Sequence, residues 1–164
     1  MRETDSLSRI RFWLAIFVAG LVLSGITAFP LQAELRGLVS LLHTEEIRPA
    51  AESTGLLSWI ELVDEGLHRT GSDYPFLAYG TDWLAFAHLA IAVAFWGPYR
   101  DPVRNKWVIS FGLIACAGVI PLALIAGQIR HIPWGWRLVD CSFGIAGSIP
   151  LLICRRLVRE LEGR

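Results

Sequence analysis

Four long apolar stretches, each long enough to cross a bilayer, dominate the pattern of hydrophobic and polar positions. They cover about residues 12–31, 76–96, 107–129 and 138–154. A bilayer core of about 30 Å needs roughly 20 apolar residues in a helix, because lipid offers no hydrogen-bond partner to an open backbone. The links at residues 97–106 and 130–137 are short, which favours antiparallel neighbours. We therefore predict one all-α membrane domain over residues 1–164, an antiparallel bundle of four transmembrane helices.

The long connection over about residues 32–75 has a weaker pattern of its own. Apolar residues recur at helical spacing in two pieces, at Leu35, Leu38, Val39 and Leu42, and at Leu56, Leu57, Ile60, Val63 and Leu67. Glu61, Asp64 and Glu65 lie opposite the second set, and Pro49 and Gly55 separate the two pieces. This pattern predicts a partly helical extracytoplasmic segment that lies on the outer membrane surface or caps the bundle.

The basic residues are divided unequally between the two predicted sides of the membrane. Ten of the 15 Lys and Arg residues, including Arg2 and Arg164, lie on the side of both termini, and five lie opposite. Cytoplasmic flanks keep the positive charges, so both termini are predicted to be cytoplasmic. Arginine-rich flanks with this orientation are typical of a bacterial inner membrane protein.

Composition removes several classes of function. Hydrophobic residues make up 54% of the chain, charged residues make up 18%, and the formal net charge is zero. A neutral chain has no global field that would attract nucleic acid. The three cysteines include no closely spaced pair, which argues against a disulfide framework or a thiol–disulfide enzyme. No nucleotide-binding, hydrolase or zinc-protease motif is present, so the sequence identifies no cofactor and leaves open whether the protein is an enzyme.

Small residues form a strip on each predicted membrane helix, and membrane helices associate through such strips. The strips are Gly20, Ser24 and Ala28; Ala78, Ala85 and Ala92; Gly112, Ala115 and Cys116; and Gly144, Gly147 and Ser148. Because lipid does not drive leucines together, we expect these strips to face neighbouring helices.

Four ionisable residues lie beside or on these strips. Asp82 and His88 flank the strip of the second helix, while Asp140 shares the face of Gly144 with Arg137 one turn outward. Ionisable residues inside a span are candidate functional groups. We therefore predict a polar site made by Asp82, His88, Arg137 and Asp140.

Structural explanations compete for each member of this site. His88 could be a neutral histidine bonded to a serine or a backbone carbonyl. Asp82 could form an ion pair with Arg130 or Arg137, and Asp140 could pair with Arg137, three residues away.

Other polar groups are weaker candidates. Arg130, Trp134 and Trp136 could form an outer mouth for an anionic or aromatic ligand, although interfacial anchoring explains the same residues. The spacing of His43 with Glu46 and of His68 with Asp73 resembles metal-ligand pairs, but it is weak evidence, and solvated loop residues explain it better. The basic segment that begins at Arg155 is typical of attraction to anionic lipid.

These residues support functions of different classes. The first is a site, open to the outer side, that binds or moves a small molecule, an ion or a proton. The second is an accessory or scaffolding subunit that binds another membrane protein or a second copy of this chain. A small membrane-embedded enzyme, or a haem- or pigment-binding bundle that rests on His88 alone, is a further alternative.

Overall fold

The computed structural model describes residues 3–163, and this part of the chain is helical with no strand. Four of its helical segments are long and apolar enough to cross a membrane, as the apolar stretches predict. They are Asp5–Ala28, Pro75–Arg100, Lys106–Ile129 and Trp134–Glu162. Arg2 and Arg164, which contribute to the predicted charge asymmetry, lie outside the described residues.

The helices follow one another with short breaks. In chain order they are α1 (Glu3–Ala28), α2 (Leu31–Leu42), α3 (Arg48–Ser53), α4 (Leu56–Asp73), the 3-10 helix η1 (Pro75–Ala78), α5 (Tyr79–Ala94), α6 (Trp96–Arg100), α7 (Lys106–Ile129) and α8 (Trp134–Glu162). The chain divides into two compact units, and the boundaries between them fall within α1 and α5. The core unit comprises Met1–Val22 and Ala90–Arg164, and the hairpin unit comprises Leu23–Leu89.

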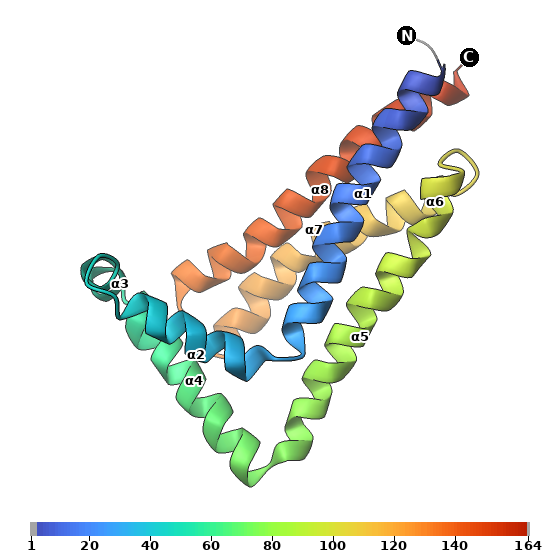
Figure 1. The fold of residues 1–164 in the computed structure, drawn as a ribbon. Coiled ribbons are helices and arrows are strands. Elements are labelled where there is room, and N and C mark those ends of the chain that lie inside the picture. Colours follow the sequence, from blue (N-terminus) through green and yellow to red (C-terminus); the bar gives the residue numbers. More distant parts are fainter. Residues whose placement is uncertain (1–2, 164) are drawn as a thin grey trace. The chain divides into compact units, whose positions relative to one another are not determined.

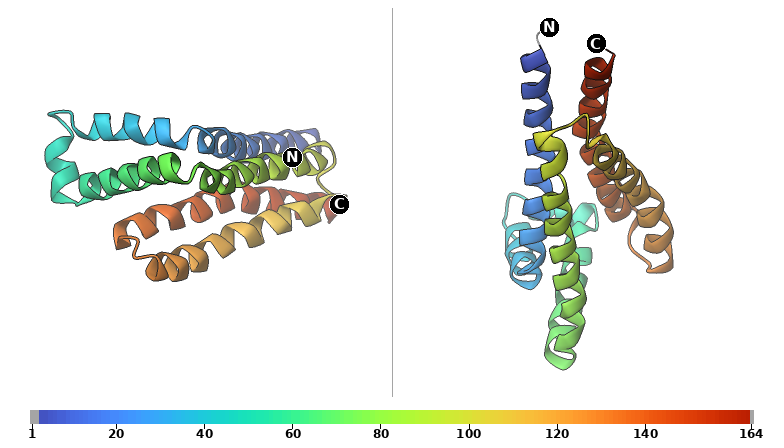
Figure 2. Two further views of the ribbon diagram at one scale, coloured as in Figure 1. Left: turned by 90° about the horizontal axis from the view of Figure 1, so that it is seen from below. Right: turned by 90° about the vertical axis from the view of Figure 1, so that its right-hand side faces the viewer.

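Helices α7 and α8 pack side by side and antiparallel in the core unit (Figures 1 and 2). Glycine makes this approach possible. A Cβ atom on Gly144 would lie 2.5 Å from the backbone oxygen of Cys116 on α7, and one on Gly112 would lie 2.8 Å from Cδ1 of Leu151 on α8. The small-residue strips predicted on these two helices therefore face each other, as expected for close packing in lipid.

Helix α1 joins the same apolar core. The thiol of Cys154 on α8 lies 3.6 Å from the backbone oxygen of Ile10 on α1. Fully buried apolar side chains surround this contact: Ile10, Leu14, Phe95, Ile109 and Leu151. The described start of α1 and the end of α8 consequently lie at the same end of the core unit (Figure 1).

Helices α2 and α4 form the centre of the hairpin unit and are connected through α3 (Figures 1 and 2). Their mutual faces bury Leu35, Leu42, Leu57 and Ile60, which confirms both predicted helical pieces of the long connection. Gly55 precedes α4 with a φ of 71°, a left-handed conformation that favours glycine.

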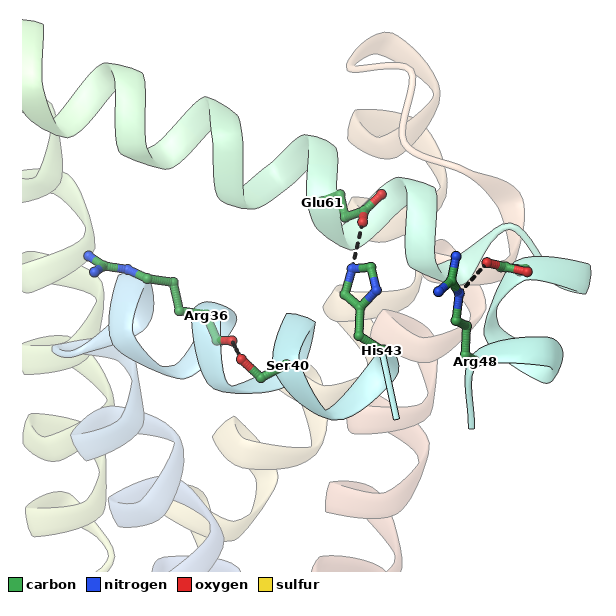
Figure 3. Close-up of polar contacts among 6 residues, drawn as sticks. Arg36, Ser40, His43, Arg48 and Glu61 are labelled. Atoms are coloured by element: carbon green, nitrogen blue, oxygen red, sulfur yellow. Dashed lines mark hydrogen bonds and ion pairs between the residues drawn. The ribbon is translucent and has the colours of Figure 1, made fainter. Parts of the chain in front are cut away.

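Two hydrogen bonds connect α2 to α4, one near each end of the seam between the two helices. The Nε2 atom of His43 lies 2.8 Å from Oε1 of Glu61, as Figure 3 shows. Gln32 Nε2 lies 3.3 Å from Nδ1 of His68. Between these polar ends, apolar side chains fill the seam, so the hairpin has a small core of its own.

Several boundaries and faces differ from the prediction. The first helix ends at Ala28, because Pro30 interrupts the backbone hydrogen bonding, and Leu31 begins α2. Pro49 lies in the first turn of α3, where proline is tolerated, so it belongs to a helix rather than separating two. Helix α8 extends beyond the predicted 138–154 at both ends.

The predicted packing strip of the first helix is wrong. Gly20 and Ser24 are exposed, whereas Gly25 is buried. A Cβ atom on Gly25 would lie 3.0 Å from the backbone oxygen of Ala85, which is itself fully buried within the same unit. The strip predicted on the second helix therefore packs at Ala85, but its partner on α1 is Gly25.

Candidate functional site

The four residues of the predicted polar site belong to different units. Asp82 and His88 lie on α5 in the hairpin unit, and Arg137 and Asp140 lie on α8 in the core unit. That these four residues form a single site stays a prediction.

Arg137 lies in the first turn of α8 and is buried, with 9% of its surface exposed, because its side chain extends into the connection between α7 and α8. Its Nε donates to the backbone oxygen of Ile132 at 2.7 Å, and its Nη1 donates to Oε1 of Gln128 at 2.6 Å. The guanidinium also lies 5.8 Å from the centre of the Trp134 ring. Its aliphatic stem fills the space over Gly127, where a Cβ atom would approach it to 2.9 Å. Arg137 therefore ties the end of α7 to the start of α8.

Asp140 lies one turn further along α8 and is half-buried. The ion pair with Arg137 that the spacing suggested is not formed, since no ion pair or hydrogen bond joins the Asp140 carboxylate to another described residue of the core unit. The direction of helical side chains explains this, because they lean towards the helix N-terminus. The guanidinium of Arg137 thus extends back into the turn, and the Asp140 carboxylate has no basic partner among the described residues of the core unit.

The residues of the predicted outer mouth surround this turn. Arg130 and Trp134 are exposed, and Trp136 is half-buried. His131 has a φ of 56°, so the chain reverses through a left-handed residue between α7 and α8. Trp134 contributes to the Arg137 environment, whereas Arg130 makes no side-chain hydrogen bond or ion pair with the described part of this unit.

Asp82 lies in the first turn of α5 and is exposed. Its carboxylate has no hydrogen bond or ion pair with the described residues of the hairpin unit. Aromatic side chains surround its position on the helix: the Trp83 ring makes edge contacts with Tyr79 at 5.9 Å and with Phe86 at 6.0 Å. The carboxylate is therefore an isolated charge in an apolar, aromatic stretch.

His88 is half-buried on the same helix, and its Nδ1 lies 2.8 Å from the backbone oxygen of Leu84. A carbonyl only accepts, so Nδ1 carries the hydrogen of this bond. In the neutral ring, Nε2 then holds a lone pair that can accept a proton or bind a metal. The bond to a backbone carbonyl matches the structural alternative for His88, and it leaves one ring nitrogen available.

The two histidines of the weaker predicted pairs, His43 and His68, contact other residues than their sequence spacing suggests. His43 contacts Glu61 rather than Glu46, and His68 contacts Gln32 rather than Asp73. Both bonds depend on how α2 and α4 are aligned, which sequence spacing does not report. Within residues 3–163 no group of three or more His, Cys, Asp or Glu residues could hold a metal ion.

Figure 3 also shows an ion pair made by Arg48 near His43. The Nε of Arg48 donates to Oε1 of Glu52 at 2.7 Å, one turn further along α3. This hydrogen bond, together with the charge of the carboxylate, raises the pKa of Arg48. The pair is exposed and stabilises the short helix locally.

Sequence reasoning missed the glutamines. Gln128 and Gln32 each bond a residue that was singled out as a candidate, yet neither lies at a motif spacing from its partner. Only the antiparallel pairing of α7 with α8, and of α2 with α4, brings these amides within reach.

Comparison of the chain with family models, curated proteins and solved structures gives no match.

Proposed function

We propose that this chain is a small polytopic membrane protein that binds or moves a small cation or a proton. Asp140, near the outer side of the bilayer, would bind the cation. Asp82, also near the outer side, and His88, deeper in the bilayer, would carry a proton. In this proposal both termini are cytoplasmic and the membrane is a bacterial inner membrane. Arg137 has a structural role in the α7–α8 turn rather than a role as a ligand.

The observation that carries the proposal is the unpaired state of Asp140. A half-buried carboxylate lies three residues from an arginine, yet that arginine donates to Gln128 and Ile132 instead. Withdrawing an ionised carboxylate from water costs several kcal/mol unless an opposite charge or hydrogen bonds compensate. A bound cation or an added proton supplies that compensation.

The second apolar segment contributes groups of matching chemistry. Asp82 is a carboxylate without a partner in its own unit, and Nε2 of His88 holds a lone pair that no bond to Leu84 occupies. The two residues lie six positions apart, so His88 is about 9 Å further along the helix axis. A carboxylate near the surface and an imidazole below it are suited to passing a proton inward.

The unfolding temperature of the protein in neutral detergent tests this binding. We expect wild type to be stabilised when sodium replaces choline at constant ionic strength, because a bound sodium ion compensates the charge of the half-buried carboxylate. The Asp140→Asn variant should lose this response, while Glu46→Gln, which changes an exposed carboxylate outside the spans, should keep it. An unchanged response in Asp140→Asn would refute the proposal.

A subunit role is the second candidate, and exposed leucines of the hairpin unit favour it. Leu41 and Leu62 are 51% and 60% exposed on helices outside the four apolar spans. A partner membrane protein, or a second copy of this chain, would cover such side chains.

Two neighbouring substitutions separate folding from partner binding. Ile60 is 1% exposed in the α2–α4 seam, so Ile60→Ser should destabilise the hairpin by about 2–4 kcal/mol. Leu62→Ser should leave stability within about 0.5 kcal/mol, yet release any polypeptide that co-purifies with wild type. Chemical denaturation and gentle affinity purification measure the two effects. A co-purifying polypeptide that stays bound to Leu62→Ser would contradict a subunit role for this surface.

The haem or pigment alternative rests on the free Nε2 of His88. A purified protein with visible absorption that His88→Gln abolishes would support it.

A further inference from the structure

A shallow cavity of about 540 Å³ lies along the last turns of α8. Five residues of this one helix line it: Leu152, Arg155, Arg156, Arg159 and Glu160. All of them belong to the core unit, and none takes part in the proposed cation site.

In a bilayer that α8 spans, the cavity would lie at the depth of the lipid headgroups. The apolar stretch of the fourth span ends at Cys154, but α8 continues for eight residues to Glu162, a length of about 12 Å. Headgroup regions add roughly 5–8 Å to each side of the hydrocarbon core. The arginines that follow Cys154 are therefore held by a regular helix within the headgroup layer.

The start of α7 supports this depth independently. Lys106 Nζ lies 2.6 Å from Oε1 of Glu162, which aligns the first turn of α7 with the last turn of α8. Trp107 follows Lys106 directly and is 65% exposed. Exposed tryptophans are typical of the membrane–water interface, so the interface passes beside Arg159.

The lining of the cavity has a net positive charge, which suits the binding of one negatively charged phosphodiester. Arg155 and Arg159 lie four residues apart on one helix face, and neither guanidinium bonds another described side chain of the core unit. Arg156 Nε lies 3.3 Å from Oε1 of Glu160, so this carboxylate is already paired. Three guanidinium groups and one carboxylate leave two net positive charges at the site.

Leu152 distinguishes a lipid from a free anion. It lies one turn deeper than Arg155 and is 53% exposed, in the apolar part of the span. An acyl chain that descends from a phosphate bound between Arg155 and Arg159 would run along this side chain, whereas inorganic phosphate would not reach it.

We propose that this cavity binds the headgroup of an anionic phospholipid, with Arg155 and Arg159 donating to the phosphate oxygens and Leu152 contacting the first carbons of an acyl chain. Arginine is suited to this role because its planar guanidinium donates two parallel hydrogen bonds to phosphate. Basic pockets at the ends of membrane helices favour anionic lipids for the same reason.

Native mass spectrometry of the full chain in neutral detergent tests the site. We expect wild type to retain one phosphatidylglycerol and to retain phosphatidylcholine at least tenfold less. The double substitution Arg155→Gln, Arg159→Gln should weaken phosphatidylglycerol retention at least tenfold. Both side chains are exposed, and circular dichroism checks that the variant keeps its helical content.

A charge-matched pair and a deeper substitution complete the test. Arg100→Gln with Arg104→Gln removes two exposed charges from the α6–α7 connection and should leave the retained lipid unchanged. Leu152→Ser should weaken phosphatidylglycerol retention, and added inorganic phosphate should not displace the lipid. Equal loss in both arginine pairs would show non-specific charge attraction, and displacement by phosphate would show a free-anion site. Either result would overturn the proposal.

Discussion

Replacing Arg137 with alanine should lower the free energy of unfolding by about 2–4 kcal/mol, because the buried guanidinium makes two charge-assisted hydrogen bonds. The substitution leaves the backbone oxygen of Ile132 without its donor and opens a space over Gly127. Titration of a denaturing detergent into mixed micelles, followed by circular dichroism, measures this loss.

Arg130 provides the matched control for this substitution. It lies in the same turn, is exposed, and makes no side-chain bond within the described core unit, so Arg130→Ala should change stability by less than about 0.5 kcal/mol. Equal effects of the two substitutions would mean that Arg137 does not hold the turn.

The second large effect is expected at Gly144. A Cβ atom there would lie 2.5 Å from the Cys116 backbone oxygen, so Gly144→Ala forces α7 and α8 apart. Overpacking of this kind costs about 1–3 kcal/mol, and backbone atoms yield less readily than a side chain. We expect the same unfolding titration to show a loss in this range.

Gly118 separates this effect from helix propensity. It lies on α7 with no atom within 4 Å of the position that a Cβ would occupy. Gly118→Ala should therefore be neutral or slightly stabilising, since alanine favours a helix more than glycine does. A loss at Gly118 as large as that at Gly144 would show that the close approach of α7 and α8 is not what matters.

The apolar pattern predicts the membrane helices well, because a segment that crosses lipid must be both apolar and helical. The third stretch was expected at 107–129, and α7 covers Lys106–Ile129. Helix α8 exceeds its apolar stretch because backbone hydrogen bonding continues through Arg155 and Arg159, where hydrophobicity has already ended. The hydrophobic pattern thus predicts the apolar span, but it does not predict where the helix ends.

Side-chain partners are predicted less well, because they depend on alignment between helices. Gly25 and Ser24 are adjacent in the sequence and therefore about 100° apart around the helix. The repeat of small residues does not indicate which of these two residues contacts a neighbouring helix. His43 bonds Glu61, eighteen residues away, through the pairing of α2 with α4. The grouping of Asp82 and His88 with Asp140 stays a prediction for a similar reason, since these residues belong to different units.

The proposed function depends most on the claim that Asp140 is not paired with Arg137, and a double-mutant cycle measures that claim directly. The unfolding free energies of wild type, Arg137→Ala, Asp140→Asn and the double variant give the coupling between the two side chains. We expect a coupling below about 0.5 kcal/mol, because Arg137 donates to Gln128 and Ile132 instead. A coupling above about 1.5 kcal/mol would show that the ion pair forms, and the half-buried carboxylate would then need no cation or proton.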